Sequence, residues 1–311
     1  MTRPENQAFL FLIQAINERH NEVAFSCFSS AKTDITNKFI NSLRGMSGWA
    51  GAIIPAMLLV IPVILLGWLG GMLVNYVSDV YPIKRKLIAP VCLKCGERQP
   101  FINYFLWPRQ CTHCGMRRKI RTWIVEGSAI LIAVWLWDQG SLVLGFFPGF
   151  LVLAYFGIVA VIDLEHRLIP HPISLVGSVI GLVIGTWQHG LVPTLLGCLA
   201  GFVTMLVLFL FGELFVKIVI RRRRPDFEDT ALGFGDVILG GVLGLFVGWP
   251  GIVLALIAGI LIGGVGVILY LIVRLALGRY RSFDFVPYGP FLLAGAFFAL
   301  FYKELLLTLL N

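Results

Sequence analysis

Long apolar stretches separated by short polar and basic connections dominate this chain of 311 residues. A helix needs about 20 mainly apolar residues to cross the hydrocarbon core of a membrane. The stretches that approach this length cover approximately residues 48–75, 122–138, 141–162, 172–188, 191–219, 235–249, 251–274 and 287–308. Because the second, fourth and sixth are short or rich in glycine, they predict seven or eight spans. We therefore expect an all-α polytopic membrane protein with about eight transmembrane helices.

The composition excludes two other classes of protein. Apolar residue types make up 58% of the chain and charged types only 14%, whereas a soluble domain carries roughly 25% charged residues. The chain is therefore neither an ordinary soluble globular protein nor a disordered one. Glycines such as Gly240, Gly241 and Gly244 fall within one predicted span, and such small-residue faces let helix backbones approach closely in lipid.

The basic residues are concentrated on alternate connections and so predict an orientation. Ten of the 25 Lys and Arg residues fall within 84–121, and the connections near residues 139, 189 and 250 contain none. Since loops on the cytoplasmic side carry an excess of Lys and Arg, the expected cytoplasmic connections are 76–121, 163–171, 220–234 and 275–286. The net charge of +8 is then an orientation signal that also suits anionic lipid headgroups, and we expect no nucleic-acid partner.

Residues 1–45 are polar and close to charge-balanced, and they lack the order of regions of a secretory signal. Met46 stands just before the first span, which leaves two interpretations. Either the natural start is Met46 and the extension is an upstream artefact, which we favour, or residues 1–45 form a short accessory helix outside. The predicted organisation is an N-terminal extension, a first transmembrane helix, a cytoplasmic zinc insert and a transmembrane core, over residues 1–45, 46–75, 76–121 and 122–311.

Four of the six cysteines form two tight pairs within the first basic connection. Cys92 and Cys95 are separated from Cys111 and Cys114 by 15 residues. Two such pairs supply four thiolates for one tetrahedral ion, and a closed site of four thiolates is typical of structural zinc. A disulfide is disfavoured because the cytosol is reducing. The remaining cysteines, Cys27 and Cys198, are expected to be isolated thiols.

Two aspartates stand out at membrane depth. Asp163 ends the third predicted span, and Asp236 opens the sixth within Gly-Phe-Gly-Asp. The predicted orientation puts both at the cytoplasmic face, at similar depth. Carboxylates at this depth are costly and indicate a functional site, and a pair that shares one proton can activate water against a peptide carbonyl. The alternative for either residue alone is an interfacial charge at a helix end.

Other acidic residues are assigned no catalytic role. Glu126 begins the second span, where it is either an interfacial charge or part of a second site. Asp79 lies just beyond the first predicted span. Glu213 and Lys217 are spaced to pair on one helix.

Together these pieces resemble the bacterial type IV prepilin peptidases, membrane aspartic proteases of the Gly-x-Gly-Asp type. The resemblance covers about residues 65–295, and its strength lies in the order of the motifs. They are Gly71 to Asn75 with Tyr81-Pro82, the two cysteine pairs, Arg121 with Val125-Glu126, Ile162-Asp163 with Leu168-Ile169-Pro170, Gly233-Phe234-Gly235-Asp236, and Val286-Pro287-Tyr288-Gly289-Pro290-Phe291.

The resemblance implies a substrate and a reaction. Family members cleave the short basic leader from prepilins and pseudopilins of pilus or secretion systems, on the cytoplasmic side of the inner membrane. Carried over by position, Asp163 and Asp236 are the catalytic pair. Members with the cysteine insert typically also methylate the new N-terminal amine with S-adenosylmethionine. No glycine-rich nucleotide loop is apparent, so no residue is assigned to that cofactor.

The chain departs from the family pattern at four places, none of which removes a catalytic carboxylate. His171 stands where Asp or Asn is usual, Ile238 replaces a usual Lys, the first cysteine pair lacks its frequent Pro, and no Arg precedes Pro82. These departures put the substrate preference in doubt.

Two other classes of function remain open from the sequence. An ion-coupled transporter would use Asp163 and Asp236 for coupling, but it would be expected to show internal repeats with broken segments in corresponding places, and none is convincing here. A catalytically inactive scaffold in a secretion assembly is the third hypothesis, and the intact aspartates argue against it.

Overall fold

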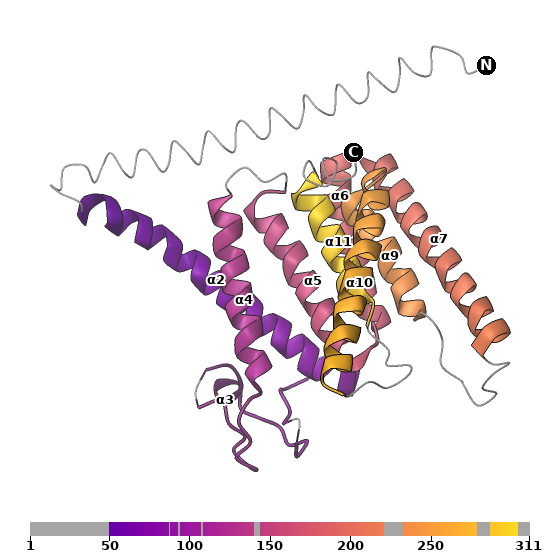
Figure 1. Ribbon diagram of the computed structural model, residues 1–311. Coiled ribbons are helices and arrows are strands. Elements are labelled where there is room, and N and C mark those ends of the chain that lie inside the picture. Colours follow the sequence, from indigo (N-terminus) through magenta and orange to yellow (C-terminus); the bar gives the residue numbers. More distant parts are fainter. Residues whose placement is uncertain are drawn as a thin grey trace. The chain divides into compact units, whose positions relative to one another are not determined.

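The computed structural model describes residues 50–86, 88–92, 94–106, 108–139, 144–220, 233–278 and 287–303 (Figure 1). The expectations for residues 1–45, Met46 and Cys27 lie outside these described residues. So do most of the predicted connections 220–234 and 275–286 and the end of the last predicted span.

The described residues form helices and contain no strand, which confirms the all-α fold. Each of the eight predicted spans corresponds to a helix. These are α2 (Ala50–Lys84), α4 (Ile120–Asp138), α5 (Phe146–His166), α6 (His171–His189), α7 (Leu191–Phe215), α9 (Phe234–Val247), α10 (Gly251–Ala276) and α11 (Gly289–Phe301). The short helix α3 (Phe101–Phe105) lies between α2 and α4, and α7 continues as a π-helical turn, η1 (Val216–Ile220).

Within the part of the chain that the structure describes, five helical segments are long and apolar enough to cross a membrane, so this is a multi-pass membrane protein. They are Val60–Pro82, Ile120–Asp138, Phe146–His166, Leu191–Ile218 and Gly251–Ala276. Helices α9 and α11 are apolar but have only 14 and 13 residues. At a rise of 1.5 Å per residue each covers roughly 20 Å, short of the roughly 30 Å of a hydrocarbon core.

The first predicted span ends at residue 75, but α2 continues to Lys84. Apolar character falls at Asn75, Ser78 and Asp79, and yet all three side chains are buried, at 1%, 0% and 3% exposure. A helix can continue through polar residues when other elements cover them. A hydropathy pattern does not predict this cover. Helix α2 ends where Arg85 adopts a left-handed φ of 53° and donates its N–H to the Tyr81 carbonyl, a common way of closing a helix. We call residues 85–119 the insert.

The chain divides into two compact units. The first contains the described residues up to Gly71 together with Glu126–Phe150. Within it, α2 and α4 approach closely because a Cβ on Gly71 would lie 2.7 Å from the Glu126 Cα. The Trp68 indole N–H donates to Glu126 Oε2 at 3.1 Å, and Glu126 is buried. Glu126 is therefore covered by α2, and the two alternatives for it, an interfacial charge or part of a second site, stay predictions.

Helix α9 is the central element of the second unit, which comprises Met72–Val125 and the described residues from Leu151 onward. It packs against α6, α7, α10 and α11 (Figure 1). Its contact with α7 is made by facing glycines, because a Cβ on Gly201 would collide with the Gly240 carbonyl and one on Gly197 with the Gly244 carbonyl. The predicted small-residue face on this helix is thus used for close packing.

This packing sets the depth at which α9 begins. The Phe234 ring lies 5.9 Å from the Phe209 ring of α7, whereas the helical run of α7 and η1 continues to Ile220. The N-terminal end of α9, which carries Asp236, is therefore level with the interior of the neighbouring candidate span.

Candidate active site and cysteine cluster

The four predicted cysteines of the insert come together in one cluster. The Cys92 and Cys114 sulfurs are 3.6 Å apart, as are those of Cys95 and Cys111, and all four lie within 4.8 Å of one another. Zinc–sulfur bonds of about 2.3 Å in a tetrahedron place sulfurs about 3.8 Å apart. The geometry therefore suits a zinc ion held by four thiolates, while His113 stays exposed outside the cluster.

The two cysteine pairs are built by the same backbone turn. Gly96 N–H donates to the Cys92 carbonyl at 2.9 Å, and Gly115 N–H donates to the Cys111 carbonyl at 3.0 Å. Both glycines have a left-handed φ, 73° and 67°, which a residue with a Cβ adopts at a cost. Backbone N–H groups of Cys114 and His113 lower the pKa of the Cys111 thiol to about 6. A thiolate, the form that binds metal, is thus favoured at neutral pH.

Asp163 lies in the last turn of α5. Its carbonyl accepts the N–H of Arg167 at 2.8 Å, and Arg167 ends the helix with a left-handed φ of 52°. The carboxylate is buried at 5% exposure and accepts the backbone N–H of Gly289 at 3.1 Å. The first residue of α11 therefore holds a carboxylate that is 126 positions earlier in the chain.

Asp236 lies in the first turn of α9 and is also buried, at 9% exposure. Its N–H donates to the Gly233 carbonyl at 3.0 Å. A Cβ on Gly235 would lie 3.2 Å from the Ile169 Cβ, so the two aspartate-bearing segments touch beside the carboxylates. Asp236 interacts electrostatically with Asp163 and with Tyr288.

The end of α5 and the starts of α9 and α11 thus meet around two buried acids. Three of the segments singled out in the sequence, those around Asp163, Asp236 and Gly289, form one site. Two carboxyl groups that sense each other's charge in a low-dielectric setting do not both ionise readily. The arrangement can therefore offer a base and a proton donor on the two sides of a bound carbonyl.

Another buried acid, Asp79, was assigned no role from the sequence. Its Oδ2 accepts the Tyr104 hydroxyl at 2.7 Å and an ion pair from Arg118, and its Oδ1 pairs with Arg121. Burial and the Asp79 charge raise the pKa of Tyr104 above its ordinary value, so the hydroxyl remains a donor. The available signal was the spacing of Asn75, Ser78 and Asp79, which puts three polar residues on one face of an apolar helix.

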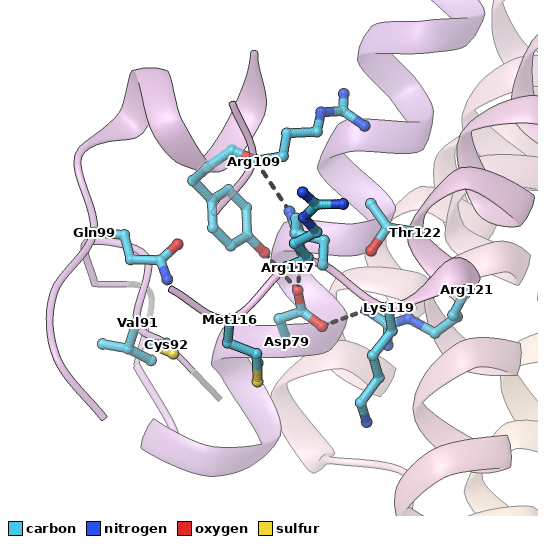
Figure 2. A pocket seen from close by; sticks show the side chains of 12 residues that line it. Asp79, Val91, Cys92, Gln99, Arg109, Met116, Arg117, Lys119, Arg121 and Thr122 are labelled. Carbon is cyan, nitrogen blue, oxygen red and sulfur yellow. Dashed lines mark hydrogen bonds and ion pairs between the residues drawn. The ribbon is translucent and has the colours of Figure 1, made fainter. Parts of the chain in front are cut away.

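Asp79 lines a small pocket, partly open to solvent, between α2, the insert and the start of α4. Figure 2 shows the Asp79 carboxylate among the basic side chains of this pocket. Five basic residues contribute to the lining, namely Arg109, Arg117, Arg118, Lys119 and Arg121. Half of the ten Lys and Arg residues within 84–121 therefore line this pocket.

Comparison with known proteins independently supports the resemblance to the type IV prepilin peptidases. A model of the type IV leader peptidase family matches residues 150–268, a segment that contains both Asp163 and Asp236. Two proteins named prepilin leader peptidase/N-methyltransferase, from Burkholderia pseudomallei strains 1026b and K96243, are each 29% identical to this chain over 241 residues. Each alignment covers 72% of this chain and 71% of the relative. No solved structure matches.

The family match covers the two aspartate motifs read from the sequence, and the similarity to the relatives extends over most of the chain. These matches give no support to the transporter hypothesis. By its sequence and by these matches, the chain is similar to the type IV leader peptidases over residues 150–268 and to two prepilin leader peptidase/N-methyltransferases over most of its length.

Proposed function

We propose that this protein cleaves the leader peptide of type IV prepilins or pseudopilins, with Asp163 and Asp236 as its catalytic pair. The observation that carries the proposal is geometric: both carboxylates are buried inside the region matched by the family model, at the ends of two helices whose adjoining residues Ile169 and Gly235 touch. The concentration of Lys and Arg on alternate connections supports a location in the bacterial inner membrane, with the site facing the cytoplasm.

The geometry supports distinct roles for the two acids. The Gly289 N–H donates to Asp163, and such a donor suits an ionised carboxylate. Asp163 then takes a proton from water as the oxygen of that water bonds to the scissile carbonyl carbon. Asp236 protonates the carbonyl oxygen. When the carbon–nitrogen bond breaks, the departing amine takes the proton held by Asp163, and Asp236 regains its proton from the hydroxyl of the new carboxyl group.

Two further elements belong to the proposal. The four cysteines hold a structural zinc ion, because their spacing and their separations suit tetrahedral thiolate coordination. The new N-terminal amine is then methylated with S-adenosylmethionine, as the name of both relatives suggests. No residue of this chain is assigned to that cofactor.

The experiment that tests this function uses the full chain in lipid vesicles with a purified prepilin. Mass spectrometry is expected to show the leader and the mature pilin as separate products, without any ion gradient across the vesicle. Adding S-adenosylmethionine is expected to add one methyl group to the mature product. An intact prepilin after prolonged incubation would overturn the peptidase assignment, and an unmethylated product would overturn only the second activity.

Substitution of Gly289 by Ala is expected to reduce kcat/KM for prepilin cleavage by roughly a hundredfold. A Cβ at this position would lie 2.5 Å from Asp163 Oδ2 and 3.0 Å from its Cγ, so the carboxylate must move away from its N–H donor. Gly264→Ala is the matched control, because a Cβ there meets nothing within 4 Å. Equal rates for the two variants would show that the position of Asp163 is not held by Gly289.

A further inference from the structure

We propose that Arg121 and Glu165 are positioning residues for Asp163. Arg121 joins Asp79 to Glu165 through two ion pairs, and Glu165 is two residues from Asp163 on α5. The chain of ion pairs Asp79–Arg121–Glu165 would hold the end of α5, and with it Asp163, against α2 and the start of α4. This inference rests on the proposed function of Asp163.

The two ion pairs use the planar fork of one guanidinium. Arg121 Nη2 pairs with Asp79 Oδ1, and Arg121 Nη1 pairs with Glu165 Oε2. A guanidinium presents donors in fixed directions, whereas an ammonium is a single point charge on a flexible stem. One arginine can therefore fix the separation of two carboxylates that lie far apart in the sequence, and a lysine cannot.

One end of this chain is firmly anchored. Asp79 is 3% exposed, and its second oxygen is held by Arg118 and by the Tyr104 hydroxyl. The Arg118 guanidinium lies 3.9 Å from the centre of the Tyr104 ring and donates to the Tyr104 carbonyl at 3.2 Å. Both of these residues belong to the insert, so Asp79 is fixed by the segment that carries the cysteine cluster.

The other end acts on the helix turn that carries Asp163. Residues two apart on an α-helix point about 200° from each other, so Glu165 faces Arg121 while Asp163 faces Gly289. The hydrogen bond from Arg167 N–H to the Asp163 carbonyl closes the helix turn, and Glu165 lies within that turn. A shift of Glu165 must therefore shift Asp163. Within the described residues, the ion pairs of Arg121 are with Asp79 and Glu165 and not with either proposed catalytic carboxylate, which separates its role from catalysis itself.

The charges of the network balance. Asp79 and Glu165 contribute two negative charges, and Arg118 and Arg121 contribute two positive ones. Removing one partner of a buried pair leaves its neighbour uncompensated. The loss of Arg121 is therefore expected to move both carboxylates, whereas a neutral replacement of Glu165, which is 30% exposed, releases only the end of α5.

The test measures kcat and KM for prepilin cleavage by the full chain in vesicles, per folded and zinc-loaded enzyme. Arg121→Gln and Glu165→Gln are each expected to lower kcat about tenfold while KM stays within about twofold. The double variant is expected to be no slower than the slower single variant, because both substitutions break the same connection. Arg121→Lys is expected to resemble Arg121→Gln. Lys119→Gln, at an exposed neighbouring position, is the control with unchanged kcat.

Three results would overturn the positioning role. The first is a wild-type kcat in both single variants, even where their thermal stability falls. The second is multiplication of the two effects in the double variant, which would mean independent roles. The third is a pH optimum that moves in opposite directions in Arg121→Gln and Glu165→Gln, with full kcat at each new optimum, because that would indicate electrostatic tuning. An Asp163→Asn arm separates the two proposals, since continued cleavage by that variant would refute the catalytic assignment itself.

Discussion

Replacing either Asp163 or Asp236 by Asn is expected to lower prepilin cleavage by a factor of about a thousand or more. An amide has nearly the shape of a carboxyl group, but it neither accepts a proton from water nor donates an acidic one. The variant therefore keeps the packing at the ends of α5 and α9 and loses the chemistry. The measurement is kcat/KM for release of the leader from a purified prepilin by each variant in vesicles.

The double variant Asp163→Asn with Asp236→Asn is expected to be about as inactive as either single variant. Residues that act as one catalytic unit show strongly non-additive effects, because the loss of one member disables the other. Asp138→Asn is the matched control, since Asp138 is an exposed carboxylate at the end of α4 and belongs to neither of the two helix ends that carry the acids. Normal processing by either single active-site variant would refute the paired-acid mechanism.

These variants are also expected to accumulate in the membrane at least as well as the wild type. Both carboxylates are buried, and a neutral amide is cheaper to bury than an ionised group. Loss of cleavage would then reflect catalysis and not failure to fold. Equal protein levels by immunoblotting, together with equal zinc content, are the checks on this point.

The helices themselves were largely predictable from the sequence because a membrane span is a one-dimensional signal. Each of the eight apolar stretches became a helix, and their edges were wrong where polar residues are covered by partners. The end of α2 is the clearest case, since its partner Arg118 lies 39 positions beyond Asp79. The hydropathy of residues 76–84 contains no information about such a partner.

The candidate site was predictable in its parts and not in its contacts. Asp163 and Asp236 were found because a carboxylate at membrane depth is costly, and the cysteines because their spacing fits one ion. That Gly289 holds Asp163, or that Ile169 touches Gly235, depends on packing among α5, α9 and α11. The network around Asp79 was missed for the same reason, because its position just beyond a span looked ordinary.

The second large effect is expected in the insert, where Cys111→Ser should abolish zinc binding and open the fold of residues 85–119. The insert has little else to hold it, because its buried side chains within the described residues are chiefly Val91, Cys92, Tyr104, Arg109 and Cys111. A structural zinc ion contributes on the order of 10–16 kcal/mol to folding in small domains that depend on it. Metal analysis per chain and limited proteolysis within the insert are the two measurements.

Cys198→Ser on α7 is the matched control for this variant, since Cys198 is a thiol outside the cluster and its replacement should leave zinc content unchanged. Cleavage by Cys111→Ser is expected to fall as well, by less than in the aspartate variants. The insert supplies Tyr104 and Arg118, which anchor Asp79, so an opened insert loosens Arg121 while both proposed catalytic acids remain. Full zinc occupancy in Cys111→Ser would contradict four-cysteine coordination, and wild-type cleavage by a zinc-free protein would show that the insert does not support the site.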